Sequence, residues 1–175
     1  MVILYEIIKI LTFPGALVKG FLEHLFCRIY KVPVEYADYM QRNELCGHVE
    51  HLLAKHRGSF GICFGPHILM LLFGSVISFA AAMNLFYIGT FGWLSIILLY
   101  VGISFLTNCF PLVEDALNMW DELFSSDAKT VSKVCLAVPA AVMLAGSYVE
   151  RYGLTLLTGA AWAYVLPWLV ALIVG

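Results

Sequence analysis

Charged residues are scarce in this chain. Of its 175 residues, 13% are charged and 62% are hydrophobic, and this charged share is about half that of a typical soluble domain. A soluble chain of this length has too small an interior to bury so much apolar surface. The interval between Arg57 and Glu114 contains no charge at all. It is more than twice the roughly 20 residues that one helix needs to cross the hydrocarbon layer, so at least two spans fit there.

The sequence also lacks an excess of positive charge, a leader motif and a disulfide framework. Its net charge of −2 is not that of a nucleic-acid-binding protein, so we expect no nucleic acid as a partner. Residues 1–6 carry no basic segment, and no A-x-A cleavage site follows, which argues against a cleaved signal peptide. The five cysteines lie in or beside apolar segments or near a basic loop that we place in the cytosol, so we expect reduced thiols.

The apolar segments predict an all-α integral membrane protein with about five membrane-embedded helices. The first segment is interrupted at Pro14-Gly15, which predicts a broken helix with its break near residues 13–15 and its second part over residues 16–30. The other four embedded helices are expected over residues 62–83, 85–109, 131–149 and 154–174. Since the sequence contains no repeat and no low-complexity linker, we expect residues 1–175 to form a single membrane domain.

Residues 28–57 are polar and form the main extramembrane loop. Alternating apolar and polar residues over 32–36 are typical of an edge strand, whereas Leu45, Val49 and Leu52 recur at helical spacing. We therefore expect a short β-hairpin followed by a helix.

Residues 111–126 are predicted to form an amphipathic helix at the membrane surface. Pro111 suits its first position, because the N–H that proline lacks would be unpaired there. The helix has an apolar stripe opposite acidic residues, made of Val113, Leu117, Trp120 and Phe124. Seven Lys and Arg residues fall in the loops of one side and only Arg151 on the other. The positive-inside rule therefore places residues 28–57 and 111–132 on the cytosolic side.

Three segments resemble a known family. Residues 11–28 read LTFPGALVKGFLEHLFCR, residues 47–51 and 65–67 read GHVEH and GPH, and residues 102–120 read GISFLTNCFPLVEDALNMW. In this order they resemble small site-2-protease-like membrane metalloproteases. The patterns of that family are roughly LTFPGxxxHExxHxxFC, GYVxHE before a span that starts with GP, and GISxxxHxFPxxxDAxNxW. The resemblance covers most of residues 11–120 and implies a membrane-embedded zinc protease fold.

The chemistry of that family is replaced in this chain. A helical His-Glu-x-x-His motif supplies two zinc ligands and a general base, and the resemblance places Lys19, Gly20 and Glu23 at these positions. A lysine ammonium does not ligate a cation at neutral pH, glycine supplies no base, and one carboxylate does not make a tetrahedral site. Asn108 stands where the family has a further histidine. The vestigial site that the resemblance implies comprises Lys19, Gly20, Glu23, Asn108, Asp115 and His51.

These replacements predict a catalytically inactive relative, without catalytic residues, metal or cofactor. Its expected role is that of a structural or regulatory subunit that binds the transmembrane segments of partner proteins. Its partners would be the lipid bilayer and other integral membrane proteins in a complex.

Two other classes of function stay open. An active zinc metalloprotease would need relocated ligands, for which His24, His51 and Asp115 are the candidates. The spacing Cys46-x-His48-x-x-His51 also looks like a metal site, since a helix would put the two histidines on one face, but a solvated juxtamembrane loop accounts for it better. A transporter has little support, because paired intramembrane charges and inverted halves are both missing.

A further hypothesis concerns the replaced ligand. Unpaired charges within a membrane cost about 2.5 to 3.5 kcal/mol each, so the Lys19 ammonium is expected to take the place of the metal cation. In this position it would neutralise Glu23, Asp115 or both and lock the first helix to the helix after residue 111.

Overall fold

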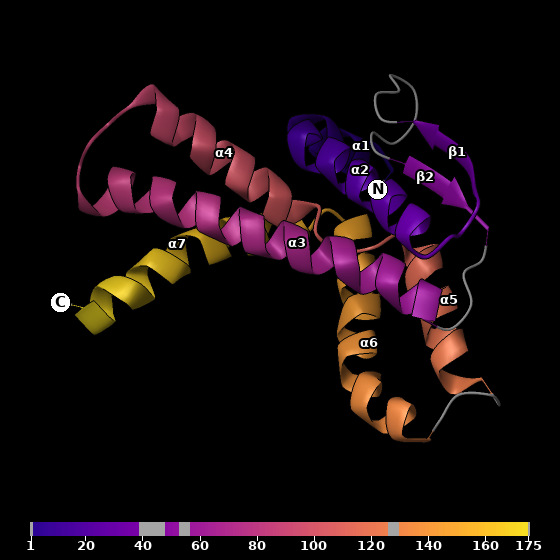
Figure 1. Cartoon of the computed structure of the whole chain (residues 1–175). Coiled ribbons are helices and arrows are strands. Elements are labelled where there is room, and N and C mark those ends of the chain that lie inside the picture. Colours follow the sequence, from indigo (N-terminus) through magenta and orange to yellow (C-terminus); the bar gives the residue numbers. More distant parts are fainter. Residues whose placement is uncertain (1, 39–47, 53–56, 126–129, 175) are drawn as a thin grey trace.

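The computed structural model describes residues 2–38, 48–52, 57–125 and 130–174, and within them the fold is predominantly helical, as predicted (Figure 1). The helices are α1 (Val2–Leu11), α2 (Phe13–Ile29), α3 (Arg57–Ala82), α4 (Trp93–Thr107), α5 (Val113–Phe124), α6 (Thr130–Arg151) and α7 (Thr155–Val174). A π-helical turn, η1 (Met83–Tyr87), continues α3. Strands β1 (Val34–Asp38) and β2 (His48–His51) form a two-stranded antiparallel sheet.

Among the residues that the structure describes, three helical segments are long and apolar enough to cross a membrane. They are Gly58–Tyr87, which joins α3 to η1, Lys133–Arg151 in α6 and Thr155–Ile173 in α7. Helix α4 is as apolar but has only 15 residues, so the helix predicted over residues 85–109 is shorter than expected. Its first residues instead continue α3 and then turn at Gly89, whose φ of 72° suits glycine because it has no Cβ.

The first apolar segment is broken between α1 and α2, as the proline predicted. The break falls at Thr12, one residue before the expected range, and Pro14 lies in the first turn of α2. A proline is tolerated there because no helical partner exists for its missing N–H. The Thr12 N–H and hydroxyl both donate to the Ile8 carbonyl oxygen, at 2.8 and 2.7 Å, so the end of α1 is capped.

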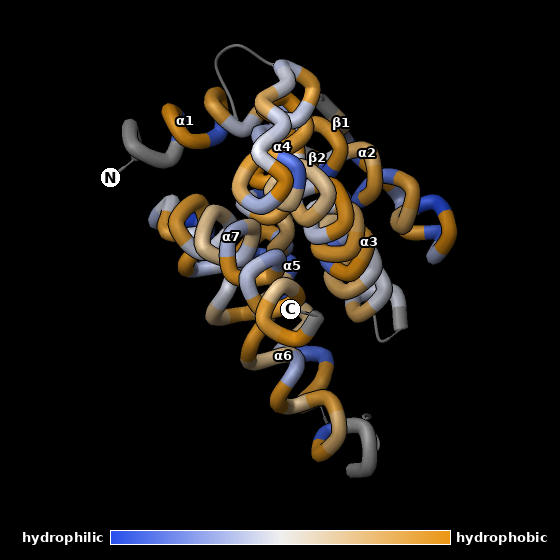
Figure 2. The backbone as a smooth tube through the Cα atoms, turned by 90° about the vertical axis from the view of Figure 1, so that its left-hand side faces the viewer, coloured by the Kyte–Doolittle hydropathy of each residue, from blue (hydrophilic) through white to orange (hydrophobic). Residues whose placement is uncertain are grey.

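Helix α3 lies at the centre of the molecule and packs against α2, α4 and α7. Small residues let the backbones approach. A Cβ added to Gly15 of α2 would lie 2.1 Å from the Ser104 carbonyl oxygen of α4, and one added to Gly102 of α4 would lie 2.7 Å from the Ser78 nitrogen of α3. Figure 2 shows that hydrophobic residues predominate along α3, α4 and α7.

Helices α5 and α6 form an antiparallel hairpin that projects from one end of α3 (Figure 1). Their shared core consists of Cys63, Met119, Leu123, Ala140 and Met143. Helix α5 begins at Val113 and not at Pro111, with Leu112 as its extended N-cap. Of the predicted apolar stripe, Leu117 and Phe124 are exposed.

The predicted hairpin is present in residues 28–57, but the helix predicted after it is wrong where the structure describes it. Residues 48–51 form β2, which pairs with β1 in a register that includes Ala37 opposite Val49. Pairing with β1 gives the backbone N–H and C=O groups of β2 hydrogen-bond partners. A helix as short as this segment is only marginally stable by itself. Cys46, like Leu45, lies outside the described residues.

Candidate functional site

Lys19, Gly20 and Glu23 lie on the buried face of α2. Residues four apart on a helix share a face, and Lys19 and Glu23 are only 4% and 3% exposed. The sequence therefore directs these three residues inward, where ionised groups need partners.

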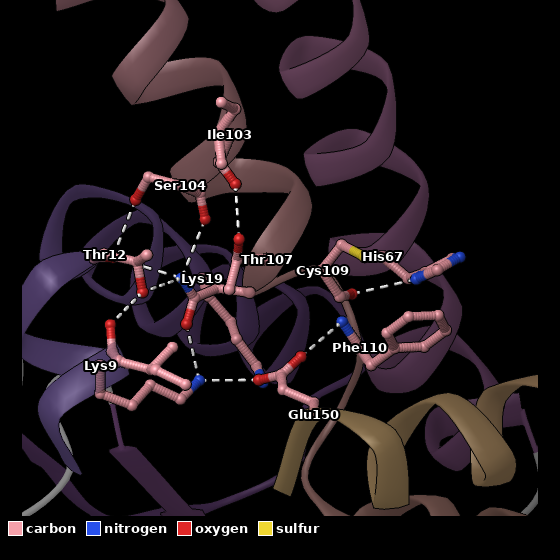
Figure 3. Close-up of polar contacts among 12 residues, drawn as sticks. Lys9, Thr12, Lys19, His67, Ile103, Ser104, Thr107, Cys109, Phe110 and Glu150 are labelled. Atoms are coloured by element: carbon pink, nitrogen blue, oxygen red, sulfur yellow. Dashed lines mark hydrogen bonds and ion pairs between the residues drawn. The ribbon is translucent and has the colours of Figure 1, made fainter. Parts of the chain in front are cut away.

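The Lys19 ammonium is held by a carboxylate from the other end of the chain. Its Nζ lies 3.0 Å from Glu150 Oε1, and the Nζ of Lys9 lies 2.7 Å from the same oxygen. The second oxygen, Oε2, accepts the Phe110 N–H at 3.0 Å. Figure 3 shows the side chains of both lysines reaching the Glu150 carboxylate. We call Lys9, Lys19 and Glu150 the Lys–Glu–Lys cluster; it joins α1, α2 and α6.

Asn108 extends this cluster to α4. It is fully buried at the C-cap of that helix, and its Oδ1 accepts from Lys9 Nζ at 2.7 Å. Its Nδ2 donates to the Thr12 hydroxyl at 2.9 Å and to the Ser104 carbonyl at 2.8 Å. An amide suits this place because it accepts from an ammonium while donating to two oxygens.

The structure pairs Lys19 with a residue that the sequence hypothesis did not include. We expected Glu23 or Asp115 as its partner, and the ion pair that closes the cluster is with Glu150. One signal was present in the sequence: Glu150 is an acidic residue at the end of an otherwise apolar segment, where an unpaired charge is costly. Lys9 was noted as costly in lipid, but its partner 141 residues away was not foreseen.

Asp115 pairs instead with His51 of the hairpin. Its Oδ1 lies 3.2 Å from His51 Nε2, and the His51 side chain is 5% exposed. The contact is an ion pair and not an aligned hydrogen bond, since Nε2 has no partner of good hydrogen-bond geometry. The other ring nitrogen, Nδ1, lies 2.9 Å from the Leu52 carbonyl oxygen. The Asp115 carboxylate, 3.2 Å away, raises the pKa of His51 to about 9, against the opposing effect of burial.

The three candidates for relocated zinc ligands do not come together in one metal group. Within the described residues, no three His, Cys, Asp or Glu side chains converge as a metal group, although His51 and Asp115 are in contact. At neutral pH a His51 with a pKa of about 9 carries a proton on both ring nitrogens, and an imidazolium offers no lone pair to a metal. His24, the third candidate, is half-buried on α2. This helix also carries Lys19 and Glu23.

The spacing Cys46-x-His48-x-x-His51 also takes a different form from the helix considered for it. His48 and His51 are the two ends of β2, so they do not share a helical face, and Cys46 is outside the described residues. The other four cysteines are free, with Cys27, Cys63 and Cys109 buried and Cys135 exposed.

The chain matches no protein-family model, no curated protein and no solved structure.

Proposed function

We propose that this chain is a catalytically inactive relative of site-2-protease-like metalloproteases. In this proposal it is an integral membrane protein that serves as a structural or regulatory subunit and binds transmembrane segments of partner proteins. The observation that carries the proposal is the buried Lys19 ammonium, 3.0 Å from Glu150, at the position where the resemblance expects a zinc ligand.

The Lys–Glu–Lys cluster contains two lysine ammonium groups and one carboxylate, so its side chains supply a net positive charge. Lys19 and Lys9 share one carboxylate, so a cation made of side chains holds α1, α2 and α6 together without a metal. Gly20, beside Lys19, has no side chain that could activate a water molecule. Loss of a general base costs about 10²- to 10⁴-fold in rate, so this site favours binding over hydrolysis.

Two features support the proposed membrane topology. Helix α3 with η1 and helix α7 are each long and apolar enough to span the membrane, and the contact between His51 and Asp115 brings the β1–β2 hairpin and α5 to the same end of α3. This supports placing residues 28–57 and 111–132 on one side of the membrane. The excess of Lys and Arg in the loops of that side makes it the cytosolic one.

The outward face of α2 is the proposed binding surface. Phe21, Leu25 and Ile29 are exposed and follow one another at intervals of four, so they form an apolar ridge on the side of α2 opposite Lys19 and Glu23. A transmembrane helix of a partner can pack along such a ridge, because association between helices in lipid depends on close side-chain packing.

Photo-crosslinking in native membranes tests this proposal. A photoreactive residue at Leu25 is expected to capture one discrete protein, whereas the same residue at Leu172, an exposed position near the end of α7, serves as the matched control. A membrane-embedded substrate should remain uncut by the purified chain. Capture of lipid alone at Leu25, or cleavage that a chelator abolishes, would contradict the proposal.

A further inference from the structure

Helix α6 runs in a different direction from the other long helices. In Figure 1, α3, α4 and α7 extend from the centre toward the same side, while α6 runs across the direction of α3. In the view turned by 90° (Figure 2), α6 again leads away from α3, α4 and α7. Helix α6 is long enough to cross a membrane, but a helix that lies crosswise to spanning helices does not cross the bilayer alongside them.

The Lys–Glu–Lys cluster marks where α6 joins the bundle. Glu150, near the end of α6, accepts the Phe110 N–H, and the neighbouring Cys109 carbonyl lies 3.0 Å from the His67 Nδ1 of α3. From His67 to Tyr87, at the end of η1, there are roughly 20 residues, or about 30 Å of helix, which is the thickness of the hydrocarbon layer. With His67 and Tyr87 taken as the two boundaries of that layer, the C-terminal end of α6 is level with one of them.

The two faces of α6 have different surroundings. Ala140 and Met143 are buried in the core shared with α5. The opposite face exposes Val134, Val138 and Val142, which are 73%, 72% and 56% exposed, and no charged residue falls between Lys133 and Glu150.

Helix α5 presents the complementary surface. Glu114 and Asp121 are exposed on it, while its Met119 and Leu123 pack against α6. The α5–α6 pair therefore exposes acidic residues on α5, together with Leu117 and Phe124, and an uncharged apolar face on α6. Such a mixture is expected of an element at the boundary between water and lipid.

We propose that α6 lies in the plane of the membrane interface, with Val134, Val138 and Val142 in contact with lipid acyl chains and α5 on its aqueous side. Only α3, α4 and α7 then cross the bilayer. This inference rests on the proposed membrane location of the chain. Its consequence is that residues 28–57 and the C-terminal end of α7 are separated by three crossings and lie on opposite sides. A spanning α6 would give four crossings and the same side.

Cysteine labelling in sealed vesicles tests the number of crossings. Arg42→Cys and Gly175→Cys are compared in a Cys46→Ser, Cys135→Ser background with a membrane-impermeant maleimide. We expect the maleimide to label the cysteine at one of the two positions, while the membrane protects the other from labelling. Equal protection would overturn the proposal.

Spin-label depth measurements test the direction of α6 independently. Labels at Val134, Val138 and Val142 are expected at one shallow depth, whereas labels at Leu157, Val165 and Leu172 of α7 should change depth along the helix. Depth that increases steadily along α6, or labels there that are shielded from lipid by protein, would overturn the in-plane proposal. Labels on α7 without any depth change would instead contradict the membrane location itself, so the two failures are distinguishable.

Discussion

At the scale of single residues, the site is organised by charges that have to find partners away from water. Lys9 and Lys19 are buried from different helices and meet at one oxygen of Glu150. Burying an ion pair costs desolvation energy, and removing one partner costs more, because a charge is then left buried alone. The cluster is therefore best tested by comparing the loss of one member with the loss of all three.

Glu150→Leu alone leaves two ammonium groups buried without their carboxylate. We expect it to lower the free energy of unfolding by about 3 to 5 kcal/mol. The triple variant Lys9→Met, Lys19→Met, Glu150→Leu should be destabilised less, since it leaves no buried charge of the cluster. Reversible unfolding in mixed micelles measures the free energy of unfolding of Glu150→Leu and of the triple variant. Arg151→Met, at an exposed position, is the control. A triple variant less stable than Glu150→Leu would refute the lock.

The His51–Asp115 pair predicts a dependence on pH. The pKa of His51 is raised from 6.5 to about 9, so protonated His51 contributes stability that is fully present below pH 6.5. This contribution is lost as the pH rises through about 9. NMR titration of the ring should show the raised pKa, and Asp115→Asn should return it toward 6.5. A ring that titrates near 6.5 in the unmodified protein would show that the pair does not form.

At the scale of elements, hydropathy and turn residues predicted most of the helices, but not how they pair. The break before Pro14, the hairpin and the amphipathic α5 follow from local patterns. Residues 48–51 were ambiguous because their period fits a helix until β1 provides a partner strand. The contact of Lys19 with Glu150 spans 131 residues, and no local pattern encodes it. The direction of α6 depends on the same long-range contact.

Close contact between α2 and α4 depends on a glycine. A Cβ at Gly15 would lie 2.1 Å from the Ser104 carbonyl oxygen, whereas a Cβ at Gly92 has no neighbour within 4 Å. Gly15→Ala is therefore expected to lower the free energy of unfolding by about 1 to 3 kcal/mol through overpacking, and Gly92→Ala should have little effect. The same unfolding assay compares the two. Equal effects would mean that α2 and α4 do not touch at Gly15.

At the scale of the whole molecule, the apolar helices and the polar contacts are segregated. One end of α3 lies near the β1–β2 hairpin, α5 and the Lys–Glu–Lys cluster. Apolar residues predominate along the rest of α3, α4 and α7 (Figure 2). This arrangement suits a membrane protein whose polar contacts are concentrated at one end. The buried residues around Lys19 form a joint between helices, which is consistent with the proposed role in binding.

The zinc content of the purified chain shows whether side chains stand in place of a metal. The protein would be purified from native membranes without chelators, and zinc would be measured per chain by mass spectrometry. If Lys19 stands where the resemblance expects a zinc ligand, and with His51 protonated at neutral pH, the purified chain should hold far less than one zinc. About one tightly held zinc per chain would contradict it.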